Sequence, residues 1–286
     1  MRTKKIYYKD VEWYSYLILA IFFSSMLIWG VYECCFKEYW YNQYPKYRNF
    51  ESLMSFMSVQ VNIMTIVWLY FLIICFNKKQ IGVTSEGFKT CIINWNLIVF
   101  IVFWIGIIYS LVTESDFLKS YTTNQIACTV ATHFICPLYL IILFVFTTGY
   151  SKLSYINWIK ERYIYISLAY PFLYMIYSYI RGLLFLQDGI SEWPYEFLEF
   201  EKDNLLVGNS VFGYMMLVIV VFATWIISQH LIMICTNNLI FFIREKYFKD
   251  ANWKNIFNKI TYKNKNQKIN TKNIKKESKD KEEIKK

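Results

Sequence analysis

The chain has 286 residues and a formal net charge of +10, with 31 Lys and Arg against 21 Asp and Glu. Its composition is 56% hydrophobic, and only 18% of the residues are charged, whereas about a quarter are charged in soluble proteins. The positive charge is concentrated at one end, because residues 244–286 hold 15 Lys and Arg against 6 Asp and Glu. This distribution argues against a basic nucleic-acid-binding globule and predicts an apolar body with a basic tail. We therefore expect no nucleic-acid partner.

Six stretches of the body are free of charge, or nearly so, over the length that a membrane span requires. A transmembrane helix needs about 20 consecutive apolar residues, and buried helices of a soluble protein would instead carry a polar stripe. We predict an all-α polytopic membrane protein with a six-span domain at residues 13–243. The transmembrane helices are expected near residues 13–32, 52–76, 91–112, 125–148, 163–186 and 210–235.

The short loops between these spans alternate in charge. Lys and Arg precede the first span and occupy the second and fourth loops, whereas the fifth loop, 187–209, carries six acids and one lysine. Because Lys and Arg are retained on the cytoplasmic side, we predict a multi-pass plasma-membrane protein with both termini in the cytoplasm, residues 1–12 forming the N-terminal one. The aromatic residues of the fifth loop fit either a lid over an outward-facing pocket or an interfacial belt, and the belt is slightly favoured.

The basic end of the chain divides into two parts. Residues 244–262 alternate apolar side chains with lysines, a pattern typical of an amphipathic helix lying on a membrane surface. Residues 263–286 contain ten lysines and no aromatic residue, which predicts a disordered cytoplasmic tail. Its expected partner is an anionic lipid headgroup. The sequence indicates no particular protein partner.

Cysteine and histidine spacing indicates neither a metal site nor a cofactor site. The seven cysteines are scattered and odd in number, and none is spaced with a histidine as in zinc or haem sites. We expect no cofactor, no metal and no disulfide framework, and membrane lipids as the principal partners.

Polar residues within the spans are the candidates for function, because polar groups are costly in lipid. Ser58 and Asn62 lie four residues apart in the second span, and Thr129 and His133 lie four apart in the fourth. Pro137, four residues further on, has no N–H group, so it leaves the carbonyl of His133 without its helical partner. We predict a kinked helix with an imidazole at the kink.

The fifth span carries a polar stripe that includes Tyr174 and Arg181. Arg181 fits two roles. It can snorkel to the interface or pair with an acid of the fifth loop, or it can hold a lipid carboxylate or phosphate. At 1.5 Å per residue, Ser58, His133 and Arg181 each lie roughly 7 to 12 Å from the outer ends of their spans. They can therefore converge in the outer half of the bilayer.

Ser58 and His133 are the candidate catalytic residues. A hydroxyl with an imidazole base suits acyl transfer to water, with Asn62, Thr129, Tyr174 and Arg181 as supporting polar residues. The alternative is that Ser58 and His133 are hydrogen-bonding contacts between helices.

Four motifs resemble a family of six-span membrane proteins. FMSVQVN (56–62), HFICP (133–137), YPFLYMIYSYIRGLL (170–184) and WPYEFLE (193–199) occur in the order found in bacterial, mollicute-type relatives of the androgen-induced and androgen-dependent membrane hydrolases. The resemblance covers roughly residues 10–240, and Gly213–Tyr214 also fits it.

The resemblance implies a hydrolase of fatty-acid esters of hydroxy fatty acids. Carried over by position, the nucleophile is Ser58, where the animal enzymes have threonine, and the base is His133. Residues 138–150 contain no acid, unlike those of many bacterial relatives. Three hypotheses remain: a lipid-ester hydrolase, a non-enzymatic lipid-handling or transporter-type protein, and a non-catalytic scaffold that recruits cytoplasmic partners through the tail.

Overall fold

A computed structural model describes residues 11–37, 46–76, 81–113, 121–149, 152–160, 162–201, 205 and 210–247. All the regular elements of these residues are helices, which confirms the predicted all-α class. By its contacts the chain divides into one unit of residues 1–238 and another of residues 239–286. The helices are α1 (Val11–Tyr32), η2 (Glu33–Lys37), α2 (Lys46–Ser55), α3 (Met57–Ile74), η3 (Gly82–Thr84), α4 (Glu86–Thr113), α5 (Thr123–Val130), η4 (Ala131–Ile135), α6 (Cys136–Thr147), α7 (Tyr155–Lys160), α8 (Tyr163–Gln187), η5 (Glu196–Leu198) and α9 (Val211–Tyr247).

Five helical segments of the described part of the chain are long and apolar enough to cross a membrane, which indicates a helical membrane protein. They are Val11–Lys37, Met57–Ile74, Glu86–Val112, Thr123–Thr147 and Val211–Lys246. The predicted fifth span coincides with α8, which has 25 residues but lies outside this set. Six tyrosines and a buried polar stripe make α8 less apolar than the other five.

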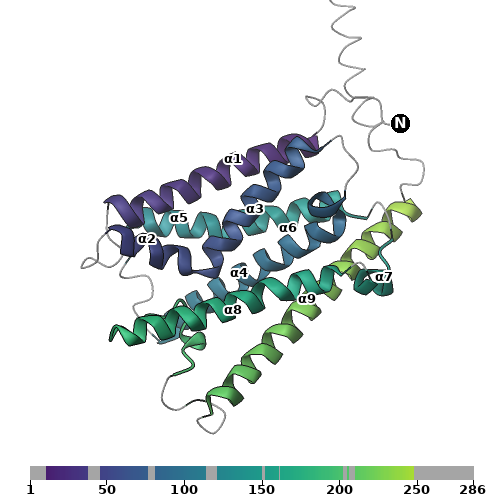
Figure 1. Cartoon of the computed structure of the whole chain (residues 1–286). Coiled ribbons are helices and arrows are strands. Elements are labelled where there is room, and N and C mark those ends of the chain that lie inside the picture. Colours follow the sequence, from purple (N-terminus) through teal and green to yellow (C-terminus); the bar gives the residue numbers. More distant parts are fainter. Residues whose placement is uncertain are drawn as a thin grey trace, which may run out of the picture. The chain divides into compact units, whose positions relative to one another are not determined.

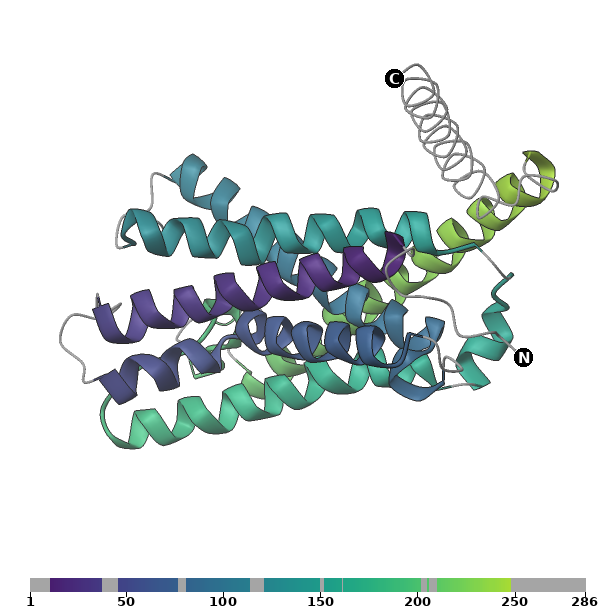
Figure 2. The ribbon, with the colours of Figure 1, turned by 90° about the horizontal axis from the view of Figure 1, so that it is seen from above.

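Within the first unit, α4 lies at the centre of the packing. It contacts α3, α6 and α8, while α1 packs along α3 and against α5 and α6. Figures 1 and 2 show α1 and α3 running side by side in both views. The core includes Phe23, Leu69, Trp95 and Leu140, none more than 4% exposed. Burial of these apolar side chains packs the helices around α4.

The predicted second span, 52–76, is not a continuous helix. It breaks at Phe56, whose extended backbone (φ −71°, ψ 132°) separates α2 from α3. Such a break leaves carbonyl groups at the end of α2 without helical partners. Gln60 Nε2 donates to the carbonyl of Met54 at 3.0 Å, and the Tyr174 hydroxyl donates to that of Ser55 at 2.9 Å. These side chains stabilise the break.

The predicted fourth span is distorted at the position expected from Pro137. A π-helical turn, η4, joins α5 to α6, and the N–H of Cys136 donates to the carbonyl of Ala131. The ladder shifts from i−4 to i−5 because Pro137 cannot donate to His133. The span begins with a capping box in which Thr122 and Gln125 satisfy each other's backbone N–H groups. This sequence of elements places His133 within the distorted turn.

The predicted juxtamembrane helix at 244–262 and the tail at 263–286 fall mostly outside the described residues. Residues 244–247 form the end of α9, which continues well past the predicted end of the sixth span at residue 235. Of the predicted cytoplasmic N-terminus, 1–12, the structure describes only the first two residues of α1.

Candidate functional site

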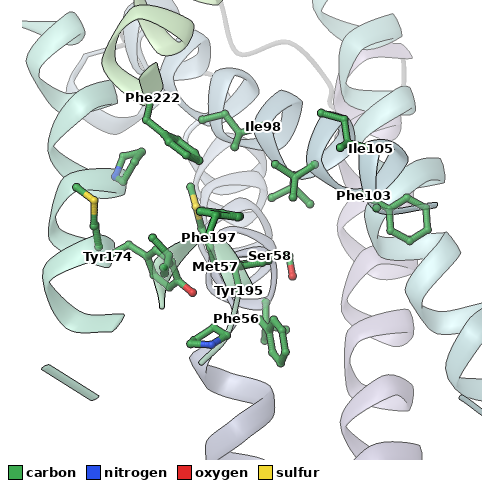
Figure 3. A pocket seen from close by; sticks show the side chains of 18 of the residues that line it. Phe56, Met57, Ser58, Ile98, Phe103, Ile105, Tyr174, Tyr195, Phe197 and Phe222 are labelled. Atoms are coloured by element: carbon green, nitrogen blue, oxygen red, sulfur yellow. The ribbon is translucent and has the colours of Figure 1, made fainter. Parts of the chain in front are cut away.

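A cavity of about 690 Å³ lies inside the first unit. It is lined by residues of α3, α4, the α5–η4 segment, α8, the fifth loop and α9. Most of the lining side chains are apolar, and Figure 3 shows several of them around Met57 and Ser58. Its volume falls within the range of sites for small organic ligands. The cavity therefore fits an apolar ligand with few polar groups.

His133 contributes an imidazole to the wall of this cavity. Its Nδ1 lies 2.9 Å from the carbonyl oxygen of Thr129 and 3.0 Å from the Thr132 hydroxyl. A carbonyl can only accept a hydrogen bond, so Nδ1 carries the hydrogen and Nε2 of the neutral ring keeps its lone pair. The ring also packs on Phe103, with ring centroids 5.2 Å apart. His133 is thus held in the tautomer that can accept a proton at Nε2.

Ser58 lines the same cavity from the first turn of α3 and is 6% exposed. The break at Phe56 puts Ser58 in a first helical turn, because α3 begins at Met57. In the view of Figure 3 its hydroxyl oxygen points toward the side of the cavity on which Phe103 lies. Since Phe103 packs on His133, the hydroxyl is directed toward the imidazole side of the cavity.

Ser58 and His133 are therefore brought to one cavity, although they lie 75 positions apart in the chain. Among the described residues, no hydrogen bond joins their side chains directly. A substrate atom or a water molecule would have to lie between the hydroxyl and Nε2 for a proton to pass. Catalytic hydrogen bonds commonly tighten only when substrate is bound.

The supporting polar residues divide into two groups. Thr129 and Tyr174 line the cavity with Ser58 and His133. Asn62 does not: it is 1% exposed, and both polar atoms of its amide are without a hydrogen-bond partner among the described residues. Arg181 does not line the cavity either.

Arg181 pairs with two acids, Glu51 of α2 and Glu192 of the fifth loop. Pairing with an acid of the fifth loop is one of the roles predicted for it. Its Nε donates to Glu51 Oε1 at 2.6 Å, and its Nη2 lies 2.9 Å from Glu192 Oε1. Its Nη1 donates to the backbone carbonyl of Glu192 at 2.9 Å. All three guanidinium nitrogens are thus engaged within the protein, so Arg181 is occupied as an anchor.

The fifth loop closes one side of the cavity, a role that the sequence left open between lid and belt. Pro194, Tyr195, Phe197 and Leu198 line the cavity, and Phe200 is fully buried. Its described aromatic residues thus pack into the bundle. Burial raises the pKa of Tyr195 above its ordinary value. Tyr195 accordingly stays protonated.

Sequence reasoning did not connect Tyr195 with Ser58. The signal was the proline and aromatic residues of the WPY sequence within an acidic loop, which are unusual for a loop that lies in water. Tyr195 and Ser58 lie 137 positions apart in the chain, and only the folded chain brings them to the same cavity.

The described residues contain no cluster of three or more His, Cys, Asp and Glu side chains able to hold a metal ion. The chain matches no protein-family model, no curated protein and no solved structure. The resemblance carried by the sequence motifs therefore stays a prediction.

Proposed function

We propose that the chain is a six-span plasma-membrane protein that hydrolyses lipid esters, with Ser58 as nucleophile and His133 as base. The observation that carries this proposal is the meeting of both residues in one apolar cavity, with Nδ1 of His133 bound to the Thr129 carbonyl. The motif resemblance to the androgen-induced membrane hydrolases supports it independently.

The proposed reaction proceeds through an acyl-serine. The Ser58 oxygen attacks the ester carbonyl carbon while its proton passes to Nε2 of His133, directly or through one water. The bond to the alcohol oxygen then breaks, and the leaving oxygen takes the proton from His133. Water hydrolyses the acyl-serine by the same sequence, which releases the fatty acid and restores Ser58.

The cavity favours a lipid substrate over a polar one. Its lining includes Val99, Val102, Leu168 and Phe222. A hydrocarbon chain entering from the bilayer exchanges one apolar environment for another, so it can occupy this cavity without a desolvation cost. A polar acyl group would lose its hydration without finding partners there.

The sixth span and the orientation belong to this proposal. The length of α8, 25 residues, corresponds to roughly 37 Å of helix, enough to cross a bilayer. The charge pattern of the loops supports cytoplasmic termini, and we propose anionic lipid headgroups as the partner of the lysine-rich tail.

Labelling with a fluorophosphonate that carries a long alkyl chain tests the proposal. Ser58 is expected to react covalently in membranes containing the full-length protein, and Ser58→Ala is expected to abolish the reaction. Ser178→Ala is the matched control, because Ser178 is a fully buried serine of α8 that does not line the cavity. Labelling that survives Ser58→Ala would contradict the proposal.

Lipid profiling identifies the ester that is hydrolysed. It compares the lipids of membranes that contain the unaltered protein with those of membranes that contain His133→Ala.

The missing direct hydrogen bond between Ser58 and His133 favours a second candidate, a lipid-handling or transporter-type protein without bond cleavage. Its cavity would hold the lipid, and the two polar residues would contact it. Lipid counter-flow in proteoliposomes that persists in both Ser58→Ala and His133→Ala would favour this function over hydrolysis.

A further inference from the structure

Two consecutive residues of the π-helical turn, Thr132 and His133, are joined through their side chains. The Thr132 hydroxyl oxygen lies 3.0 Å from Nδ1 of His133. Side chains one residue apart do not face each other on an ordinary α-helix. This contact lies in η4, where the N–H of Cys136 reaches back five residues to Ala131, and such turns are frequent at functional sites. The pair therefore belongs to the distorted part of the fourth span.

The direction of this hydrogen bond follows from the other partners of the threonine. Thr132 donates its single hydroxyl hydrogen to the carbonyl of Cys128 at 2.9 Å, and the carbonyl of Thr129 lies farther away at 3.2 Å. Toward His133 the hydroxyl oxygen therefore presents a lone pair. The Thr129 carbonyl, 2.9 Å from the same ring nitrogen, can likewise only accept. Two acceptors thus face Nδ1.

These two acceptors select one form of the neutral imidazole. In the opposite tautomer, the lone pair of Nδ1 would face the lone pairs of two oxygen atoms without a hydrogen between them. The buried surroundings make this repulsion stronger than it would be in water, because Thr132 is only 5% exposed. The hydrogen is therefore held on Nδ1, and the lone pair stays on Nε2.

Thr132 supplies what a carboxylate supplies in many hydrolases that use a histidine base. In those enzymes a third group binds the imidazole on the side away from the nucleophile, fixes its tautomer and stabilises the imidazolium that forms. Among the hydrogen bonds of the described residues, none joins His133 to a carboxylate; its ring binds the Thr129 carbonyl and the Thr132 hydroxyl. Thr132 does not line the cavity, so it acts only through the imidazole.

We propose that Thr132 is the positioning residue for His133, accepting a hydrogen bond from Nδ1 so that Nε2 remains the base. When Nε2 takes the proton of Ser58, the Thr132 oxygen and the Thr129 carbonyl both stabilise the positive ring. The inference rests on the proposed function, since it assigns Thr132 a part in the reaction of Ser58 and His133. The threonine itself transfers no proton.

The test is the rate of Ser58 labelling by the alkyl fluorophosphonate, measured as a function of probe concentration in membranes containing the full-length protein. Thr132→Val keeps the shape of the side chain and removes its oxygen. We expect the limiting rate constant at saturating probe to fall roughly three- to tenfold, the effect of one hydrogen bond. The half-saturating probe concentration should not change, because Thr132 does not line the cavity.

Thr132→Ser distinguishes positioning from packing. It keeps the hydroxyl and removes the methyl group, so it should restore the rate of the unaltered protein. A purely structural role would give the reverse order, because valine preserves the packing and serine does not. Thr132→Ala, which differs from Thr132→Ser only in the oxygen, repeats the comparison where Thr132→Val does not fold.

Thr90→Val is the matched control. Thr90 of α4 is 3% exposed, donates to the carbonyl of Glu86 at 2.9 Å and does not line the cavity. It therefore resembles Thr132 in burial and in its bond to the helix backbone, and its replacement should leave the labelling rate unchanged. Thermal unfolding of all the variants separates a folding defect from a slower reaction.

Each outcome bears on one proposal in a different way. A slower limiting rate in Thr132→Val that Thr132→Ser restores supports the assignment of Thr132. Rates equal to that of the unaltered protein in Thr132→Val, or equally slow rates in both variants, overturn this assignment while the hydrolase proposal stands. Failure of the unaltered protein to label at Ser58 overturns the proposed function and the role of Thr132 with it.

Discussion

Arg181 of α8 and Glu51 of α2 are joined by two hydrogen bonds, from Nε to Oε1 at 2.6 Å and from Nη2 to Oε2 at 2.8 Å. This parallel geometry matches the planar guanidinium to the planar carboxylate. The same guanidinium binds both the side chain and the backbone of Glu192. One arginine therefore connects α2, α8 and the fifth loop, the three elements that meet near the break in the second span.

Glu192 should make the stability of the protein depend on pH. Burial would raise its pKa, but the hydrogen bonds from Ser52, Arg181 and Arg48 and the charge of Arg181 lower it below the ordinary value. A carboxylate with a lowered folded-state pKa stabilises the fold above its unfolded pKa of about 4.3, and this contribution is lost as the pH falls through the folded value.

We therefore expect the unfolding temperature in detergent to fall as the pH is lowered below about 4.3. Glu192→Gln should lower it at pH 7 and reduce its dependence on pH in that range. Asp188→Asn, at an exposed position, is the control. Equal pH dependence of the unaltered protein and Glu192→Gln would contradict this assignment.

Gly182 is predicted to be essential for seating the fifth loop. A Cβ at this position would lie 2.2 Å from the Trp193 ring, a rigid group that cannot bend aside. Gly182→Ala should therefore displace Trp193 and destabilise the protein by about 1–3 kcal/mol, the usual effect of overpacking a core. At Gly30 the added Cβ would meet Cys128 at 3.4 Å, so Gly30→Ala should be tolerated. Thermal unfolding of the two variants measures the difference.

Gln60 and Gln229 should respond oppositely to replacement by leucine. Gln60 donates to the Met54 carbonyl at 3.0 Å and accepts from Tyr170 at 3.3 Å, so Gln60→Leu leaves a carbonyl at the break unpaired. We expect a loss of about 1–3 kcal/mol and slower labelling of Ser58.

The Gln229 amide has no hydrogen-bond partner among the described residues and is 7% exposed. Gln229→Leu should consequently be neutral or stabilising, because it removes a buried polar group without orphaning another. Reversible unfolding in detergent compares the two variants, and equal destabilisation would argue against a special role of Gln60 at the break.

The proposed orientation can be tested with single cysteines in a variant from which the native cysteines have been removed. A cysteine at position 189, in the turn after α8, should react with a membrane-impermeant maleimide added to intact cells. A cysteine at position 162, before α8, should react only after the cells are opened. Reaction of both in intact cells, or of neither, would contradict α8 as a span.

The sequence alone determined the all-α class and the spans that consist of uninterrupted apolar residues. Their length and hydrophobicity are local properties, and lipid leaves a single chain segment little choice but a helix. The sequence also located the distortion at His133, because the missing N–H of Pro137 is a covalent property. For Arg181 the sequence left two roles open, and the structure shows its pairing with a loop acid.

Only the tertiary structure decided where the second span breaks. The segment around Phe56 contains no proline or glycine, so its local pattern predicts a continuous helix. The Tyr174 hydroxyl, 119 residues away, reaches the freed carbonyl of Ser55, and the Tyr195 ring packs edge-on against Phe56 just before α3. Because these partners come from distant segments, no local pattern reveals them, and the setting of Ser58 arises only when α8 and the fifth loop pack against the second span.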